Sequence, residues 1–209
     1  EQYHFDVNQP DDAGASPLML AAKRKDLFAA EQRYLNIAKY LVDNGANVNA
    51  VDNEGRNVLF YLYKGYAQDK QLLQYLITQG INVNHLDKSG KNVLFYVKTE
   101  HIDLLLKAGA DATVVADDGT TVLMNRWLSF SDFKRLIRHG ADPSTYAKSL
   151  LQAWLEQADF FGIKIITYLI RKYSLDPNTG DKNGRTALFY SLGYGIEFDR
   201  LRKLKASYD

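Results

Sequence analysis

The chain has 209 residues, of which 46% are hydrophobic and 24% charged, close to the globular average and far from disordered or membrane proteins. Lys and Arg number 26 against 25 Asp and Glu, so the net charge of +1 lacks the basic excess typical of nucleic-acid binding. The absence of cysteine excludes disulfides, thiolate nucleophiles and cysteine zinc sites, and it fits either redox compartment. No stretch approaches the roughly 20 apolar residues of a membrane helix, so we expect a soluble protein. The chain starts at Glu1 without Met, which fits a processed product and is compatible with a periplasmic or secreted location.

A turn that ends in glycine recurs along the chain. Its intervals are 41, 35 and 29 residues and then 65, about two periods of 33, and its glycines are Gly14, Gly55, Gly90, Gly119 and Gly184. Four of these turns have the form D-x-x-G, in which the Asp side chain can accept bonds from the backbone ahead. Two residues after each glycine stands a polar residue that predicts a helix N-cap, namely Ser16, Asn57, Asn92, Thr121 or Thr186.

Two short helices follow each turn. In the second unit the apolar pattern predicts a helix over residues 58 to 63 and another over 71 to 78. Gly80, Gly109 and Gly140 stand where the second helix must stop in a left-handed conformation. The repeating unit is therefore turn, helix, helix, turn.

Two phrases carry a resemblance to a known family. SPLMLAA at 16 to 22 resembles the TPLHLAA phrase of ankyrin repeats, and GANVNA at 45 to 50 and GADAT at 109 to 113 resemble its GADVNA phrase. The resemblance implies an all-α fold, an ankyrin-repeat solenoid of helix-turn-helix units joined by β-hairpin fingers. Its irregular, Asn- and Tyr-rich units look more like bacterial than metazoan ankyrin proteins.

We expect a single ankyrin-repeat domain over residues 1 to 209. FDVN at 5 to 8 looks like the tail of a further repeat, so residues 1 to 10 form a partial unit. The first repeat carries about eight extra residues within 23 to 36, the third has lost about four, and the fifth has no D-x-x-G turn. The predicted repeats span 11–51, 52–86, 87–115, 116–146 and 147–180, and 181–209 form a polar, basic capping repeat.

No catalytic, cofactor-binding or metal-binding constellation is visible, and we expect a protein that is not an enzyme. The histidines make no metal-ligand spacing and are interpreted as surface or turn residues: His4, His85, His101 and His139. The glycines occur singly at turns, with no phosphate-binding run.

The resemblance implies that a partner protein binds at the finger tips and the adjoining face of the first helices. Aromatic residues and Arg often anchor such interfaces. Carried over by position, the candidate partner-binding residues are Asn53, Glu54, Arg56, Tyr63, Lys64, Lys88, Lys91, Asp117, Asp118, Trp127, Lys182 and Arg185. Replacing Arg56, Lys88, Lys91 and Arg185 with Ala is expected to weaken binding and to leave thermal unfolding nearly unchanged.

The heptapeptides GRNVLFY, GKNVLFY and GRTALFY, which end at Tyr61, Tyr96 and Tyr190, repeat one phrase. We expect their Leu and Phe residues to pack between helices, whereas the phenol of each Tyr is compatible with either packing or a polar edge. The protein is thus predicted to be a non-enzymatic protein-protein interaction module, monomeric when unbound. Two roles fit: an inhibitor or immunity-type protein that blocks a partner enzyme, or an adaptor or secreted effector domain.

Overall fold

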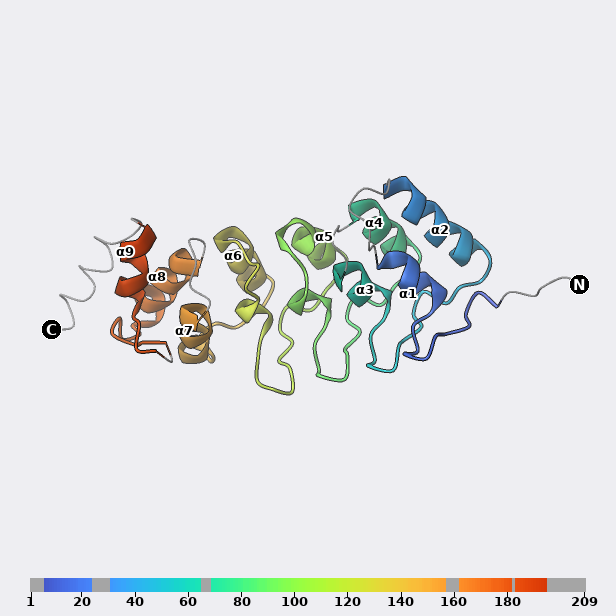
Figure 1. The fold of residues 1–209 in the computed structure, drawn as a ribbon. Coiled ribbons are helices and arrows are strands. Elements are labelled where there is room, and N and C mark those ends of the chain that lie inside the picture. The colour runs from blue at the N-terminus through green and yellow to red at the C-terminus, as the bar shows by residue number, and fades with distance from the viewer. Residues whose placement is uncertain (1–5, 24–30, 65–68, 157–161, 182, 195–209) are drawn as a thin grey trace, which may run out of the picture. The chain divides into compact units, whose positions relative to one another are not determined.

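The computed structural model describes residues 6–23, 31–64, 69–156, 162–181 and 183–194 (Figure 1). The chain divides into two compact units, residues 1–119 and 120–209, and each is described by itself.

Unit 1 contains two helical hairpins and a shortened third. Its elements are α1 (Pro17–Ala22), α2 (Glu31–Asp43), α3 (Val58–Lys64), α4 (Lys70–Thr78), the 3-10 turns η1 (Val93–Phe95) and η2 (Thr99–His101), and α5 (Ile102–Lys107). The first helices α1 and α3 contact each other, as do the second helices α2 and α4 (Figure 1). Three leucines of α4 are fully buried: Leu72, Leu73 and Leu76. The predicted helix pair of the second repeat is confirmed to within one residue at each boundary.

Local chemistry explains where these helices begin and end. Ser16 caps α1 by accepting a hydrogen bond from the Met19 amide, and Pro17 occupies the first helical position, where a missing N–H costs nothing. Asn92 caps η1 in the same manner. Gly80 ends α4 with a φ of 77°, in the left-handed region that favours glycine.

The predicted fingers are tight turns closed by backbone hydrogen bonds. In the second repeat the Gly55 amide donates to the Asp52 carbonyl at 2.9 Å, and the Asp52 amide donates to the Arg56 carbonyl at 3.0 Å. The same pair of bonds closes the turns that begin at Asp11, Asp87 and Asp181. The described residues contain no β-strand, only isolated bridge residues: Gly180 pairs with Thr186, and Val115 and Thr121 are bridge residues on either side of the fourth turn. The hairpins are therefore reduced to their turns.

Backbone hydrogen bonds join neighbouring turns of unit 1 into a row. The amides of Asn53, Lys88 and Asp117 donate to the carbonyls of Ala13, Glu54 and Ser89, respectively. Figure 1 shows these turns pointing away from α2 and α4.

Unit 2 is built around two longer helices. Its elements are η3 (Val122–Met124), α6 (Phe130–Arg138), α7 (Ala147–Glu156), α8 (Gly162–Tyr173) and α9 (Ala187–Tyr194). Trp154 is buried against Phe133, and its indole N–H donates to the Leu123 carbonyl at 2.9 Å. Ser174, with a φ of 50°, stands where the other repeats place glycine after the second helix.

The third and fourth repeats depart from the predicted helix pair. Their first helix is a single 3-10 turn, η1 or η3. In the third repeat the missing residues leave no room for a full helix before η2 and α5. Residues 24–30 of the first repeat's insertion lie outside the described residues, whereas Glu31 to Asn36 lengthen α2.

Three sequence expectations are wrong. Thr121 makes no side-chain cap hydrogen bond, and its buried hydroxyl has no hydrogen-bond partner among the residues that the structure describes. His101 is 1% exposed, because it lies between the second and third repeats. Phe189 is 55% exposed although Phe60, at the same position of its phrase, is buried: Tyr96 of the next repeat covers Phe60, whereas the ring of Phe189 packs on Tyr190 and Arg185 of its own repeat.

Candidate functional site

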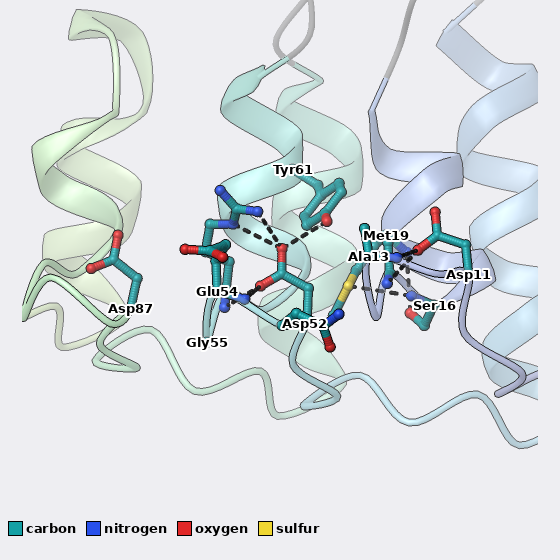
Figure 2. A network of polar contacts seen from close by, with 12 residues as sticks. Asp11, Ala13, Ser16, Met19, Asp52, Glu54, Gly55, Tyr61 and Asp87 are labelled. Atoms are coloured by element: carbon teal, nitrogen blue, oxygen red, sulfur yellow. Dashed lines mark hydrogen bonds and ion pairs between the residues drawn. The ribbon is translucent and has the colours of Figure 1, made fainter.

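Four of the fingers begin with an aspartate whose carboxylate holds the turn together, and Asp52 shows this arrangement most completely (Figure 2). Its Oδ1 accepts the amides of Glu54 and Arg56 at 2.9 and 2.8 Å. Its Oδ2 accepts the Tyr61 hydroxyl at 2.7 Å and Arg56 Nε at 2.8 Å. The carboxylate is therefore satisfied on both oxygens inside the chain.

The same nine-residue link between Asp and Tyr occurs in the two other copies of the phrase. The Tyr190 hydroxyl donates to Asp181 Oδ2 at 2.6 Å, beside Arg185, and the Tyr96 hydroxyl donates to Asp87 Oδ2 at 2.6 Å. The phrase thus ends in Tyr because its hydroxyl reaches back to the first residue of the turn. Sequence reasoning missed this bond, although the repeated spacing of Asp and Tyr was a readable signal.

Electrostatics keep the carboxylates of Asp52 and Asp181 ionised, because the pKa of each is lowered. Burial raises the pKa of Asp52, but the hydrogen bonds from Arg56 and Tyr61 outweigh it and the net pKa is lowered. Burial and the bond to Asp52 raise the pKa of Tyr61 to about 12. At Asp181 the bonds from Tyr190 and Arg185 likewise outweigh burial and lower the pKa.

Other charges at the finger tips remain available. Lys88, Glu54 and Asp117 are exposed, and in the part of the chain that the structure describes their side chains have no ion-pair partner. Asn53 is exposed too, and its side chain donates to the Asp12 carbonyl at 3.1 Å, which links the first two fingers.

An exposed aliphatic residue stands directly before three of the turns in unit 1. Val51, Leu86 and Val115 are between 42% and 46% exposed. Sequence reasoning did not single them out, although each occupies the position just before the first residue of its turn.

The predicted aromatic residues differ in their surroundings. Trp127, in unit 2, is 52% exposed, with the Arg126 guanidinium 5.0 Å from its ring centroid. Tyr63 faces the interior, where its hydroxyl lies 3.0 Å from His101 Nδ1 and the two rings pack edge to face. Burial raises the pKa of the Tyr63 phenol. The side chains of Lys64 and Lys182 lie outside the described residues.

A family model described as ankyrin repeats (3 copies) matches residues 2–87 and 27–115, together more than half of the chain. The chain is an ankyrin-repeat protein. No curated protein matches it. Ankyrin repeats form a protein-protein interaction module, and their fold is in general non-enzymatic.

Several predicted partner-binding charges of this ankyrin-repeat protein are paired within the chain. Arg56 and Arg185 pair with Asp52 and Asp181, both at 2.7 Å, and Lys91 pairs with Asp118 at 2.8 Å. The expectation that replacing these basic residues leaves stability nearly unchanged does not fit this geometry, because Arg56 and Arg185 hold the carboxylates that close their turns.

The described part of the ankyrin-repeat protein contains no group of three or more His, Cys, Asp or Glu side chains placed to hold a metal ion. Within the same ranges, no helix is both long and apolar enough to cross a membrane.

Proposed function

We propose that this ankyrin-repeat protein binds a partner protein through the finger tips of unit 1 and thereby blocks a specific enzyme. The proposed binding surface, here called the finger row, comprises Asn53, Glu54, Lys88 and Asp117 with the aliphatic residues Val51, Leu86 and Val115. The observation that carries the proposal is that these exposed side chains stand on turns joined to one another by backbone hydrogen bonds.

Rigidity of the finger row supports binding. Ordering a loop or side chain on association costs free energy, so a surface that is already ordered retains more of its contact energy as affinity. The turns that begin at Asp11, Asp52 and Asp87 are each closed by the side chain of that Asp. Neighbouring turns, including the one that begins at Ala116, are linked by the amides of Asn53, Lys88 and Asp117. A partner would therefore meet a preformed surface.

The charges of the finger row indicate which partner surface would be complementary to it. Glu54 and Asp117 supply negative charge and Lys88 supplies positive charge, whereas Arg56 and Lys91 are neutralised by acids of this chain. The complementary partner carries basic groups on either side of an acidic one, around an apolar strip that meets Val51, Leu86 and Val115.

A blocking role is favoured by the unequal fingers. Their tips differ in charge from one repeat to the next, and the repeats differ in length, as suits a surface shaped for one partner. The non-enzymatic character follows the general behaviour of the family. Binding as an adaptor or secreted effector domain is the competing role.

The test starts by identifying a partner that co-purifies with the protein from its natural source and measuring its affinity calorimetrically. The double charge reversal Glu54→Lys with Lys88→Glu leaves net charge unchanged and touches no ion pair of the described chain. We expect it to weaken binding by on the order of tenfold or more, since like charges then face each other.

The matched control is the double variant Gln71→Lys with Gln74→Glu, at two exposed positions on α4. It places one positive and one negative charge there and also leaves the net charge unchanged. Equal affinities of the two double variants would place the binding site away from the finger row. If the partner is an enzyme that loses activity at one equivalent of the protein, the blocking role holds, whereas a partner whose activity is unaffected assigns the adaptor role.

A further inference from the structure

The outer side of α2 carries large apolar side chains that nothing in the described chain covers. Ile37 is 39% and Tyr40 is 65% exposed, and with Arg33 and Asn36 they line an open depression. Residues three, four and seven apart lie on one side of a helix, so these four make a single face, here called the α2 face. Neighbouring exposed apolar side chains on one side of a helix are a candidate contact surface.

The next repeat shows what covers the same face. Gly80 follows Gly45 by 35 residues, and at that offset Ile37 corresponds to Leu72 and Tyr40 to Tyr75. Leu72 is fully buried, and Tyr75 is half-buried beneath Lys39 of α2, whose Nζ is 5.6 Å from the ring centroid. The side of α4 that matches the α2 face is therefore the side on which the preceding repeat stacks.

The third repeat follows the same rule. Its terminal Gly109 follows Gly80 by 29 residues, which makes His101 the counterpart of Leu72. His101 is 1% exposed and contacts Tyr63 of the preceding repeat. In unit 1 this position is buried wherever a repeat precedes it and is exposed at Ile37.

The segment just before the first repeat already has the geometry of a repeat's end. Asn8 donates from Nδ2 to the Gly45 carbonyl at 3.0 Å and accepts the Asn47 amide at 2.8 Å. Asn49 makes the same two bonds to Gly80 and Asn82. Asn84 repeats them with Gly109 and Asp111.

The residue two positions before Asn8 matches as well. The Asn8 amide donates to Asp6 Oδ1 at 2.9 Å, as the Asn49 amide does to Asn47 Oδ1. The segment Asp6–Asn8 therefore occupies the same position relative to the first repeat as the segment Asn47–Asn49 occupies relative to the second repeat. In the first repeat, the helix that leads into this segment is α2, and α2 contacts the next second helix, α4.

We propose that the α2 face is the stacking surface for the second helix of a further ankyrin-type repeat of the same protein, placed directly before Asp6. The alignment of the repeats specifies this helix. It leads into the Asp6–Asn8 segment, and its residue equivalent to Lys39 has a long side chain that covers the ring of Tyr40, as Lys39 covers Tyr75. This surface is separate from the finger row, and the inference does not depend on the proposed function.

The lack of cysteine in the 209-residue chain allows a direct test, because one engineered thiol per protein reports on one position. Tyr40→Cys is prepared in the 209-residue chain and in the protein that the complete reading frame encodes, where any cysteine outside these residues is replaced by Ser. Tyr75→Cys serves as the covered reference and Gln74→Cys as the exposed one, and labelling rates are measured with a maleimide at low protein concentration. Ile37→Cys repeats the test with a second side chain, and circular dichroism verifies folding.

We expect Tyr40→Cys in the 209-residue chain to react as fast as Gln74→Cys. In the complete protein it should react on the order of tenfold more slowly, like Tyr75→Cys, because the thiol is then reached only by local opening. Equal rates in both lengths, or a reading frame that encodes no helical repeat before Asp6, would overturn the proposal. Protection of the 209-residue chain that grows with protein concentration would also overturn it and assign the α2 face to a second copy.

Discussion

The hydroxyl of Tyr61 shows how one atom decides the role of a repeated residue. It donates to the Asp52 carboxylate at 2.7 Å, and both side chains are buried. The rest of the ring packs in the core, so the residue serves as both packing and a hydrogen-bond donor.

Removing this hydroxyl should destabilise the second repeat. Tyr61→Phe keeps the ring but deletes one bond to a charged acceptor, which costs about 1.5–3 kcal/mol of unfolding free energy. Urea denaturation measures the change. Tyr40→Phe, at a 65% exposed position, is the control and should match the unmodified protein. A Tyr61→Phe variant as stable as this control would mean that Arg56 and the turn amides satisfy Asp52 without it.

His101 is a second case in which the surroundings of a single residue matter. Its ring is buried beside Tyr63, and the burial lowers its pKa, with Glu100 and Asp69 opposing the shift and Lys70 adding to it. The neutral imidazole is therefore the form that the folded protein favours.

A pH dependence follows from this lowered pKa. Below the unfolded value of 6.5 the unfolded chain takes up a proton that folded His101 does not, so the free energy of unfolding falls as pH drops through that value toward the folded pKa. Denaturation between about pH 7.5 and 5.5 should show this loss. His101→Gln should flatten the profile, whereas His139→Gln, at an exposed position, should retain it. An unchanged profile in His101→Gln would show that other groups produce the dependence.

At the scale of elements, Gly80 and Gly14 require glycine for different physical reasons. Gly80, at the end of α4, has a φ of 77° but open space around a would-be Cβ. Gly14, in the first turn, has a φ of 78°, and a Cβ there would lie 2.7 Å from the Asn53 backbone nitrogen. Of these two residues, only Gly14 must be glycine for the first two fingers to contact each other.

Alanine substitutions should separate these reasons. Gly80→Ala is expected to cost about 1 kcal/mol of unfolding free energy, from backbone strain alone. Gly14→Ala adds a clash with the amide that joins the first two fingers, so its cost should exceed that of Gly80→Ala by about 1 kcal/mol or more. Chemical denaturation of both variants gives the comparison. Equal losses would mean that the first finger moves aside at little cost.

At the scale of the whole molecule, interactions between neighbouring repeats order unit 1. Asn8, Asn49 and Asn84 each bridge two consecutive repeats with one donated and one accepted hydrogen bond. In repeat proteins, stability is close to a sum of the stabilities of single repeats and of the interfaces between neighbours. The asparagines contribute to the interface part of that sum.

Asn49→Ala should therefore weaken the contact between the first two repeats. Loss of two bonds at an exposed site should cost about 1–2 kcal/mol. Amide exchange offers a local measurement, since the Asn82 N–H loses its acceptor and should exchange faster. Gln74→Ala, on the same unit but outside the bridges, should leave the Asn82 exchange rate unchanged. Slow exchange at Asn82 in the Asn49→Ala variant would contradict the bridging role.

The sequence by itself determined the phase of the repeats, the caps at Ser16, Asn57 and Asn92, and the glycines that end the second helices. These features depend on the backbone angles and side chains of a few consecutive residues, so a local pattern suffices to predict them. Only the tertiary structure decided that His101 is buried, that Phe60 is covered while Phe189 is exposed, and that Ile37 and Tyr40 remain uncovered. The physical reason is that one repeat cannot bury both of its sides alone, so the environment of each such residue is set by the neighbouring repeat that stacks on it.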